Sequence, residues 1–198
     1  MAAPATFYFD LGSPYAYLAA ERINGLFTAT GLAEPEWQPV LLGGLFERFD
    51  RRSWGVHTER AAGTAECERR ASAYGLPPFR WPDPWPPNGL FSMRVATFAK
   101  EIGRTVAFSL AAYRQAFAAG RDLSEPDNVY IAAASVELHP KAIAKAVARD
   151  AIKLRLREAT EEAGDRGVMG VPTVVVGTEV FWGDDRLEDA VAAASRGA

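Results

Sequence analysis

Segments that favour β-strands lie only near the two ends of this chain of 198 residues. Close to the N-terminus these are Thr6–Asp10, which is rich in aromatic residues, and Glu36–Leu42. Close to the C-terminus, Pro172–Val176 and Glu179–Trp182 are separated by the short turn Gly177-Thr178, which predicts a β-hairpin. A fold with this distribution must bring the two ends of the chain together into one sheet.

The residues between the strand segments predict helices. Ser13 followed by Pro14 is a helix-start signal, and we expect one helix from there to Gly31. From residue 43 to residue 149 the sequence carries helical signals and no clear strand. The helices expected in and after this block are Thr58–Tyr74, Ser92–Ile102, Val106–Ala119, Pro126–Ala134, Pro140–Val147, Asp150–Ala163 and Arg186–Ser195. This order predicts an α/β fold with a central sheet and a right-handed first crossover. Pro39 places the second strand at an edge or ends its pairing early.

Composition excludes several classes of protein. The 22 basic residues do not outnumber the 25 acidic ones, so we expect no nucleic-acid partner. No segment approaches the roughly 20 apolar residues of a membrane span, so we expect no membrane partner. The lone cysteine, Cys67, excludes an internal disulfide, and with two histidines far apart we expect no metal site. The first residues lack the pattern of a signal peptide, which favours a cytoplasmic location.

Two short motifs at the expected strand ends are candidates for chemistry. Ser13 lies between a strand and a helix, where it can act as a helix cap or as a hydrogen-bond donor to a bound anion such as a thiolate. Val171-Pro172 is either the plain start of a strand or a cis peptide that leaves the Val171 backbone free to pair with an extended peptide ligand.

Two further segments have a structural and a functional interpretation. Asp184 and Asp185 precede the last helix and can favour its N-terminus or hold the ammonium group of a ligand. The proline-aromatic region Leu76–Gly89 can cap helices or form a rigid wall for a planar substrate. The candidate pocket residues in and near this wall are Tyr15, Trp81, Trp85, Pro86, Pro87 and Asn88. Cys67 lies among charged neighbours that indicate a solvated helix face or its border, and we do not expect it to be catalytic.

Three motifs in a fixed order make the combination specific. These are F-Y-F-D-L-G-S-P-Y-A-Y-L-A (Phe7–Ala19), G-V-P-T (Gly170–Thr173) and F-W-G-D-D-R-L-E (Phe181–Glu188). Together they closely resemble the 2-hydroxychromene-2-carboxylate isomerase family, which is related to kappa-class glutathione transferases and DsbA-like thiol oxidoreductases. The resemblance runs along the whole chain. It implies a thioredoxin-like domain formed by residues 1–42 and 150–198, with an all-helical insertion at residues 43–149.

The resemblance also implies a cofactor, which is glutathione or another small thiol. Ser13 would donate a hydrogen bond to its sulfur, Val171 would pair with its backbone just before a cis Pro172, and Asp184 and Asp185 would hold the γ-glutamyl end. Ser13 and Ala16 occupy the two positions of the oxidoreductases' C-x-x-C motif, so we expect no dithiol oxidase activity.

The function implied is glutathione-dependent cis–trans isomerisation of a small aromatic degradation intermediate, in a homodimer. The alternatives are a kappa-like glutathione transferase or reductase and a non-catalytic thioredoxin-like protein that binds a thiol or a peptide. Two positions depart from the family pattern. The segment Leu45–Thr58 lacks the asparagine of many relatives, with Arg51, Arg52 or Trp54 as candidate replacements, and an Asp-Asp pair replaces the usual Asn-Asp or Ser-Asp before the last helix.

Overall fold

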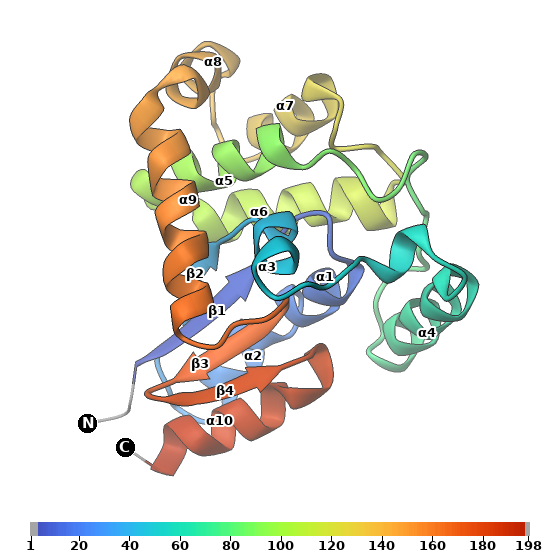
Figure 1. Cartoon of the computed structure of the whole chain (residues 1–198), viewed down its shortest axis with the longest axis vertical. Coiled ribbons are helices and arrows are strands. Elements are labelled where there is room, and N and C mark those ends of the chain that lie inside the picture. Colours follow the sequence, from blue (N-terminus) through green and yellow to red (C-terminus); the bar gives the residue numbers. More distant parts are fainter. Residues whose placement is uncertain (1–3, 197–198) are drawn as a thin grey trace.

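The two ends of the chain meet in one four-stranded mixed sheet of strand order β2-β1-β3-β4 (Figure 1). This computed structural model describes residues 4–196. β1 runs parallel to β2 and antiparallel to β3, and β3 pairs with β4 as the predicted hairpin. The strands are β1 Ala5–Phe9, β2 Glu36–Pro39, β3 Thr173–Val176 and β4 Glu179–Trp182. As predicted, Pro39 marks an edge strand, which ends there rather than at Leu42.

The helix expected from Pro14 to Gly31 is in fact two helices, α1 (Pro14–Ala20) and α2 (Ile23–Ala29). The interruption falls at Arg22, whose backbone N–H bonds to the carbonyl of Ala19 in a tight turn. The Arg22 guanidinium donates to the backbone oxygen of Asp184, 3.0 Å away. A contact with the far end of the chain therefore accompanies the break, and local helix signals could not show it.

The block from residue 43 to residue 149, all of which the structure describes, contains no strand, as predicted. One helix in it was not expected, because Gly43 and Gly44 disfavour helix formation. It packs closely on α9, where a Cβ on Gly44 would lie 3.1 Å from Thr160 Cγ2. The helices, with two short turns, are α3 Leu42–Arg48, η1 Trp54–Val56, α4 Arg60–Ala73, α5 Leu90–Glu101, α6 Thr105–Tyr113, the π-helical turn η2 Arg114–Ala118, α7 Pro126–Ala134 and α8 Pro140–Ala148.

The helices form layers on either side of the sheet. The last helix, α10 (Leu187–Arg196), packs on β3, β4 and α2, and a short turn, η3 (Asp184–Arg186), leads into it. The long helix α9 (Asp150–Asp165) runs from the sheet to the helical block, while α4 stands to one side and contacts α1 (Figure 1). None of the helices described is long and apolar enough to cross a membrane.

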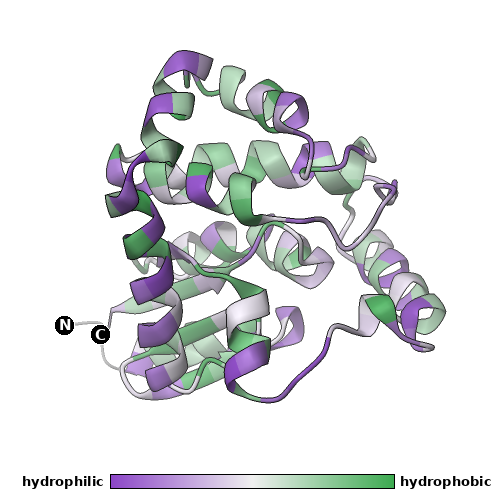
Figure 2. Ribbon diagram, turned by 45° about the horizontal axis from the view of Figure 1, so that its top comes forward, coloured by the Kyte–Doolittle hydropathy of each residue, from purple (hydrophilic) through white to green (hydrophobic). Residues whose placement is uncertain are grey.

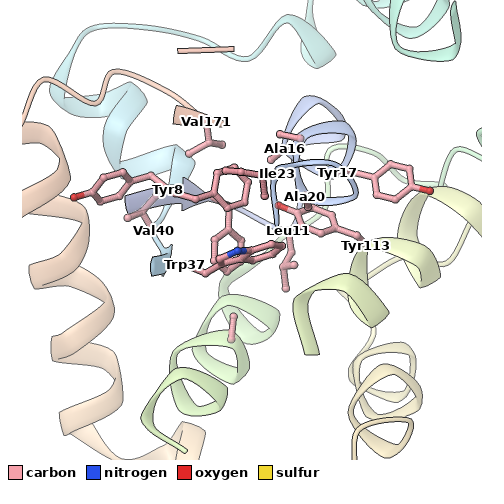
Figure 3. Packing of buried hydrophobic residues seen from close by; sticks show 14 of the residues in the cluster. Tyr8, Leu11, Ala16, Tyr17, Ala20, Ile23, Trp37, Val40, Tyr113 and Val171 are labelled. Carbon is pink, nitrogen blue, oxygen red and sulfur yellow. The ribbon is translucent and has the colours of Figure 1, made fainter. Parts of the chain in front are cut away.

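Aromatic residues of the two N-terminal strands form the centre of the core. Phe7 and Phe9 share one face of β1 and meet Trp37 of β2 at ring-centroid distances of 4.9 and 5.5 Å. Figure 3 shows this cluster, with Val171 at its upper edge and the Tyr17 side chain at the right of the view. Tyr17 is fully buried and stacks on Phe117 of the helical block. The core is therefore continuous from the sheet into the insertion.

Candidate functional site

A cavity of about 670 Å³ opens where the ends of β1, β3 and β4 meet the helical block. Loops that follow β1, precede β3 and follow β4 form one wall, and residues between α3 and α5 form the other. The structure brings most of the candidate site residues to this cavity, with Trp81 the exception; those that line it include Ser13, Tyr15, Trp85, Asn88, Val171, Pro172, Asp184 and Asp185.

Ser13 caps helix α1 and faces the loop before β3. Its side-chain oxygen accepts a hydrogen bond from the backbone N–H of Ala16 at 3.2 Å. The hydroxyl proton points toward the carbonyl oxygen of Val171, at the long distance of 3.5 Å. A contact this long is a weak hydrogen bond. Ser13 is thus both a helix cap and a poised donor, and a stronger acceptor in the cavity can take its proton.

Val171 and Pro172 are joined by a cis peptide bond, which is one of the two alternatives that the sequence left open for this motif. The N–H of Val171 forms no hydrogen bond with any residue between 4 and 196. The carbonyl of Pro172 is occupied, because it accepts the N–H of Gly183 at 2.9 Å. The Val171 backbone therefore offers a donor to an extended ligand lying in the cavity.

Asp184 and Asp185 are adjacent in sequence but have different surroundings. The Asp184 side chain is 1% exposed and accepts hydrogen bonds from Arg70 at 2.7 Å and from the hydroxyl of Tyr74 at 2.9 Å. Burial raises the pKa of Asp184 although both donors oppose the shift. Asp185 is 57% exposed and lies 3.5 Å from Arg70. The carboxylate of Asp184 is thus committed to the protein, whereas that of Asp185 can contact a ligand.

Gly183 sets the direction of this acidic pair. It has a φ of 122°, a conformation that residues with a side chain rarely adopt. An added Cβ would also lie 2.3 Å from an Asp185 carboxylate oxygen. Only glycine lets the chain turn from β4 into η3 with Asp185 in this place.

Tryptophan rings form the opposite wall. Trp85 packs on Trp54 and Trp81 at centroid distances of 4.9 and 5.0 Å, and Tyr15 meets Trp54 at 5.9 Å. Trp85 also donates from Nε1 to the carbonyl of Gly12 at 3.1 Å, which ties the two walls together. Trp54, Trp85 and Tyr15 line the cavity, while Trp81 lies behind them.

Asn88 lines the cavity but also has a structural role. Its Oδ1 accepts the N–H of Leu90 at the start of α5, at 3.3 Å, and its own N–H donates to Ser124 at 2.8 Å. These contacts hold the loop that leads into α5.

Arg70 and Asp10 are cavity residues that sequence reasoning missed. Arg70 bridges Glu66 of its own helix and Asp184, which is 114 residues away, so no local signal could have shown it. Asp10 accepts the N–H groups of Gly12 and Leu42, both at 2.8 Å, and burial raises its pKa. An aspartate two residues before a glycine is a turn signal that could have identified the first of these bonds.

Cys67 is fully buried, and not at the border of a solvated face as its charged neighbours suggested. Burial raises the pKa of its thiol to about 12. At neutral pH the thiol is protonated and therefore a poor nucleophile. The chain thus presents no reactive thiol of its own in the cavity.

The model of one protein family, described as the DSBA-like thioredoxin domain, matches residues 5–194. The chain belongs to this family. A curated relative, the 2-hydroxychromene-2-carboxylate isomerase of Sphingobium xenophagum, is 29% identical over 188 residues, or 92% of this chain and 93% of the relative. This similarity confirms the family resemblance seen in the sequence and supports an isomerase-like function.

Solved structures show the same architecture as this DSBA-like chain. A 2-hydroxychromene-2-carboxylate isomerase structure matches with a TM-score of 0.85 and 23% identity over 97% of this chain and 94% of that chain. A probable DsbA oxidoreductase from Streptomyces coelicolor matches with a TM-score of 0.78 and 22% identity over 99% of this chain and 91% of that chain. The predicted thioredoxin-like fold with a helical insertion is therefore confirmed.

Proposed function

We propose that this protein is a glutathione-dependent cis–trans isomerase of small aromatic substrates. One observation carries the proposal. The Ser13 hydroxyl lies in the cavity, at the position that the family resemblance assigns to a thiol in the oxidoreductases, and the one cysteine of the chain is buried and protonated. Thiol chemistry at this position would therefore use a thiol supplied from outside the chain.

The residues of the cavity fit a peptide-like thiol. The unpaired N–H of Val171 can pair with its backbone, and the exposed carboxylate of Asp185 can attract its ammonium group. Ser13 can donate its hydroxyl proton to the sulfur in place of the long contact to Val171. When bound, such a thiol supplies a sulfur nucleophile that adds reversibly to a conjugated double bond, which can then rotate.

The protein has three tasks in this chemistry. Ser13 stabilises the ionised sulfur and so lowers the pKa of the bound thiol. The rings of Trp54, Trp85 and Tyr15 hold a planar molecule and keep it in one orientation. Ser13 is itself buried, and its low-dielectric surroundings strengthen a charge-assisted hydrogen bond from its hydroxyl.

The substitution Ser13→Ala tests the proposal. It removes one charge-assisted hydrogen bond, which contributes on the order of 1.5–3 kcal/mol. The pKa of bound glutathione, followed by the ultraviolet absorbance of its thiolate, should rise by roughly one to two units. Turnover of the aromatic substrate near neutral pH should fall about ten- to a hundredfold and partly recover at higher pH.

Ser53→Ala is the matched control. Ser53 also caps a short helical turn, η1, and also lines the cavity, so its loss removes a cap without touching the thiol. The pKa of bound glutathione should be that of the unchanged protein. If the titration curves of Ser13→Ala and the unchanged protein coincide, Ser13 is only a helix cap and the proposal is wrong.

A further inference from the structure

Three arginines, Arg51, Arg52 and Arg70, line the cavity, and they differ in whether they form ion pairs. Arg70 is paired with Glu66 and with both aspartates of the acidic pair. Arg51 and Arg52 are exposed, line the cavity and form no ion pair with any residue of the described part of the chain. They belong to the hydrophilic connection between α3 and η1, which Figure 2 shows as a purple stretch beside the sheet. The cavity therefore has an uncompensated positive rim.

Arg51 is also held in place. Its guanidinium carbon lies 4.4 Å from the centre of the Trp182 ring at the end of β4. The Trp182 ring in turn rests on Gly170, where an added Cβ would lie 3.1 Å from the indole nitrogen. A guanidinium stacked by its face keeps its N–H edge available, and that edge matches the two oxygens of a carboxylate.

We infer that Arg51, supported by Arg52, forms a carboxylate subsite at the rim of the cavity. The inference rests on the proposed function, because it assigns the anionic end of a molecule bound there. The carboxylate belongs either to the glycyl end of glutathione or to the planar aromatic substrate. If the carboxylate belongs to glutathione, Asp185 attracts the ammonium end and Arg51 the carboxylate end of one molecule; if it belongs to the aromatic substrate, the two side chains hold two different molecules.

Two ligand pairs measured by calorimetry on the full chain distinguish these sources. The first pair is glutathione and its derivative with the glycyl carboxylate converted to an amide. The second pair is 2-naphthoate and 2-naphthamide, which differ in the same way on a planar ring system. Arg51→Gln should weaken binding of the carboxylate member of one pair about tenfold and leave its amide partner unchanged. The pair that responds identifies the source.

Two variants control for charge and shape. Arg157→Gln removes the same charge from an exposed side chain of α9 outside the cavity and should leave all four ligands unchanged. Arg51→Lys keeps the charge but loses the planar fork, so it should recover only part of the carboxylate preference. Ser13→Ala shifts the thiol pKa if the proposed function holds, but it should not alter the preference for carboxylate over amide.

The proposal has clear contrary outcomes. It is overturned if Arg51→Gln weakens carboxylate and amide equally, because Arg51 would then contribute only packing. It is also overturned if the unchanged protein prefers neither carboxylate to its amide. A failure of the proposed function appears separately, as an unchanged thiol pKa in Ser13→Ala.

Discussion

The two walls of the cavity present different chemical groups. The wall formed by the thioredoxin-like part, here called the backbone wall, uses the backbone groups of its loops, namely the Val171 N–H and the bond from Gly183 to Pro172. The wall formed by the helical block uses side-chain rings, with Trp85 at their centre. Backbone groups are present whatever the side chains are, whereas ring packing depends on every ring. The fold of the backbone wall should therefore tolerate truncation of a side chain such as Val171 better than the second wall, here called the ring wall, tolerates the loss of a ring.

The largest effect should follow from Trp85→Ala. Trp85 is 4% exposed, packs on two other tryptophans and holds the bond to Gly12 that joins the walls. We expect the free energy of unfolding, measured by urea denaturation, to fall by about 3–5 kcal/mol. Val171→Ala on the backbone wall should lower it by less than about 2 kcal/mol and keep glutathione binding. Equal losses in the two variants would abolish the distinction between the walls.

The next largest effect concerns the ion pairs of Arg70, which link α4 to the backbone wall through Asp184 and Asp185. Arg70→Met leaves the buried carboxylate of Asp184 with Tyr74 as its remaining side-chain donor. We expect the free energy of unfolding at neutral pH to fall by about 2–3 kcal/mol, since Arg70 is itself partly exposed.

The pH dependence of this loss is specific. The pKa of Asp184 is already raised by burial, and the loss of Arg70 raises it further. A carboxyl with a raised pKa in the folded state stabilises the fold relative to the unfolded chain at low pH, and this contribution disappears as the pH rises through that pKa. The deficit of Arg70→Met should therefore shrink as the pH is lowered toward the ordinary aspartate range. Adding Asp184→Asn should remove this pH dependence, and a deficit that is constant with pH would contradict the account.

A smaller effect tests how tightly the ring wall is packed. An added Cβ at Gly63 of α4 would lie 2.4 Å from the Trp54 ring. Gly63→Ala should lower the free energy of unfolding by about 1–2 kcal/mol and weaken binding of 2-naphthoate. Gly25→Ala in α2 meets nothing within 4 Å and should instead raise the free energy of unfolding by about 0.5–1 kcal/mol. Gains in stability from both variants would show that the wall is loosely packed.

The smallest effect is expected at Cys67. Its thiol has a pKa of about 12 and is fully buried, so iodoacetamide should label it only after denaturation. Turnover of Cys67→Ala should equal that of the unchanged protein. Rapid labelling of the native chain, detected by mass spectrometry, would show that α4, which carries Cys67, readily moves away from the residues that bury it.

The same division explains which parts of the site could be predicted from the sequence. Residues of the backbone wall occur in short contiguous motifs at strand ends, so Ser13, Val171 and Asp185 could be singled out from the sequence, and the family resemblance implied that they share one site. Local residue patterns also predicted the four strands and the helical character of residues 43–149. Strand pairing then required only that the two ends of the chain meet.

The ring wall could be predicted only in part. Its aromatic residues could be recognised in the sequence. The sequence did not show that Trp81 lies behind the wall or that Arg70 is part of it, because both positions depend on how α4 packs against its neighbours. The break at Arg22 and the helix α3 also depend on partners more than a hundred residues away, Asp184 and Thr160. Helix propensity reflects residues that are close in the sequence, whereas these features depend on contacts with residues that are distant in the sequence.

The tryptophan cluster has an optical consequence. Trp54, Trp81 and Trp85 are three of the five tryptophans of the chain, and their ring centroids lie between 4.9 and 6.5 Å apart. Indole rings at such distances exchange excitation energy, so light absorbed by one ring can be emitted by another. A planar molecule that enters the cavity touches this shared chromophore directly. The protein therefore carries its own spectroscopic probe, and occupancy of the cavity can be followed from its native fluorescence without a label.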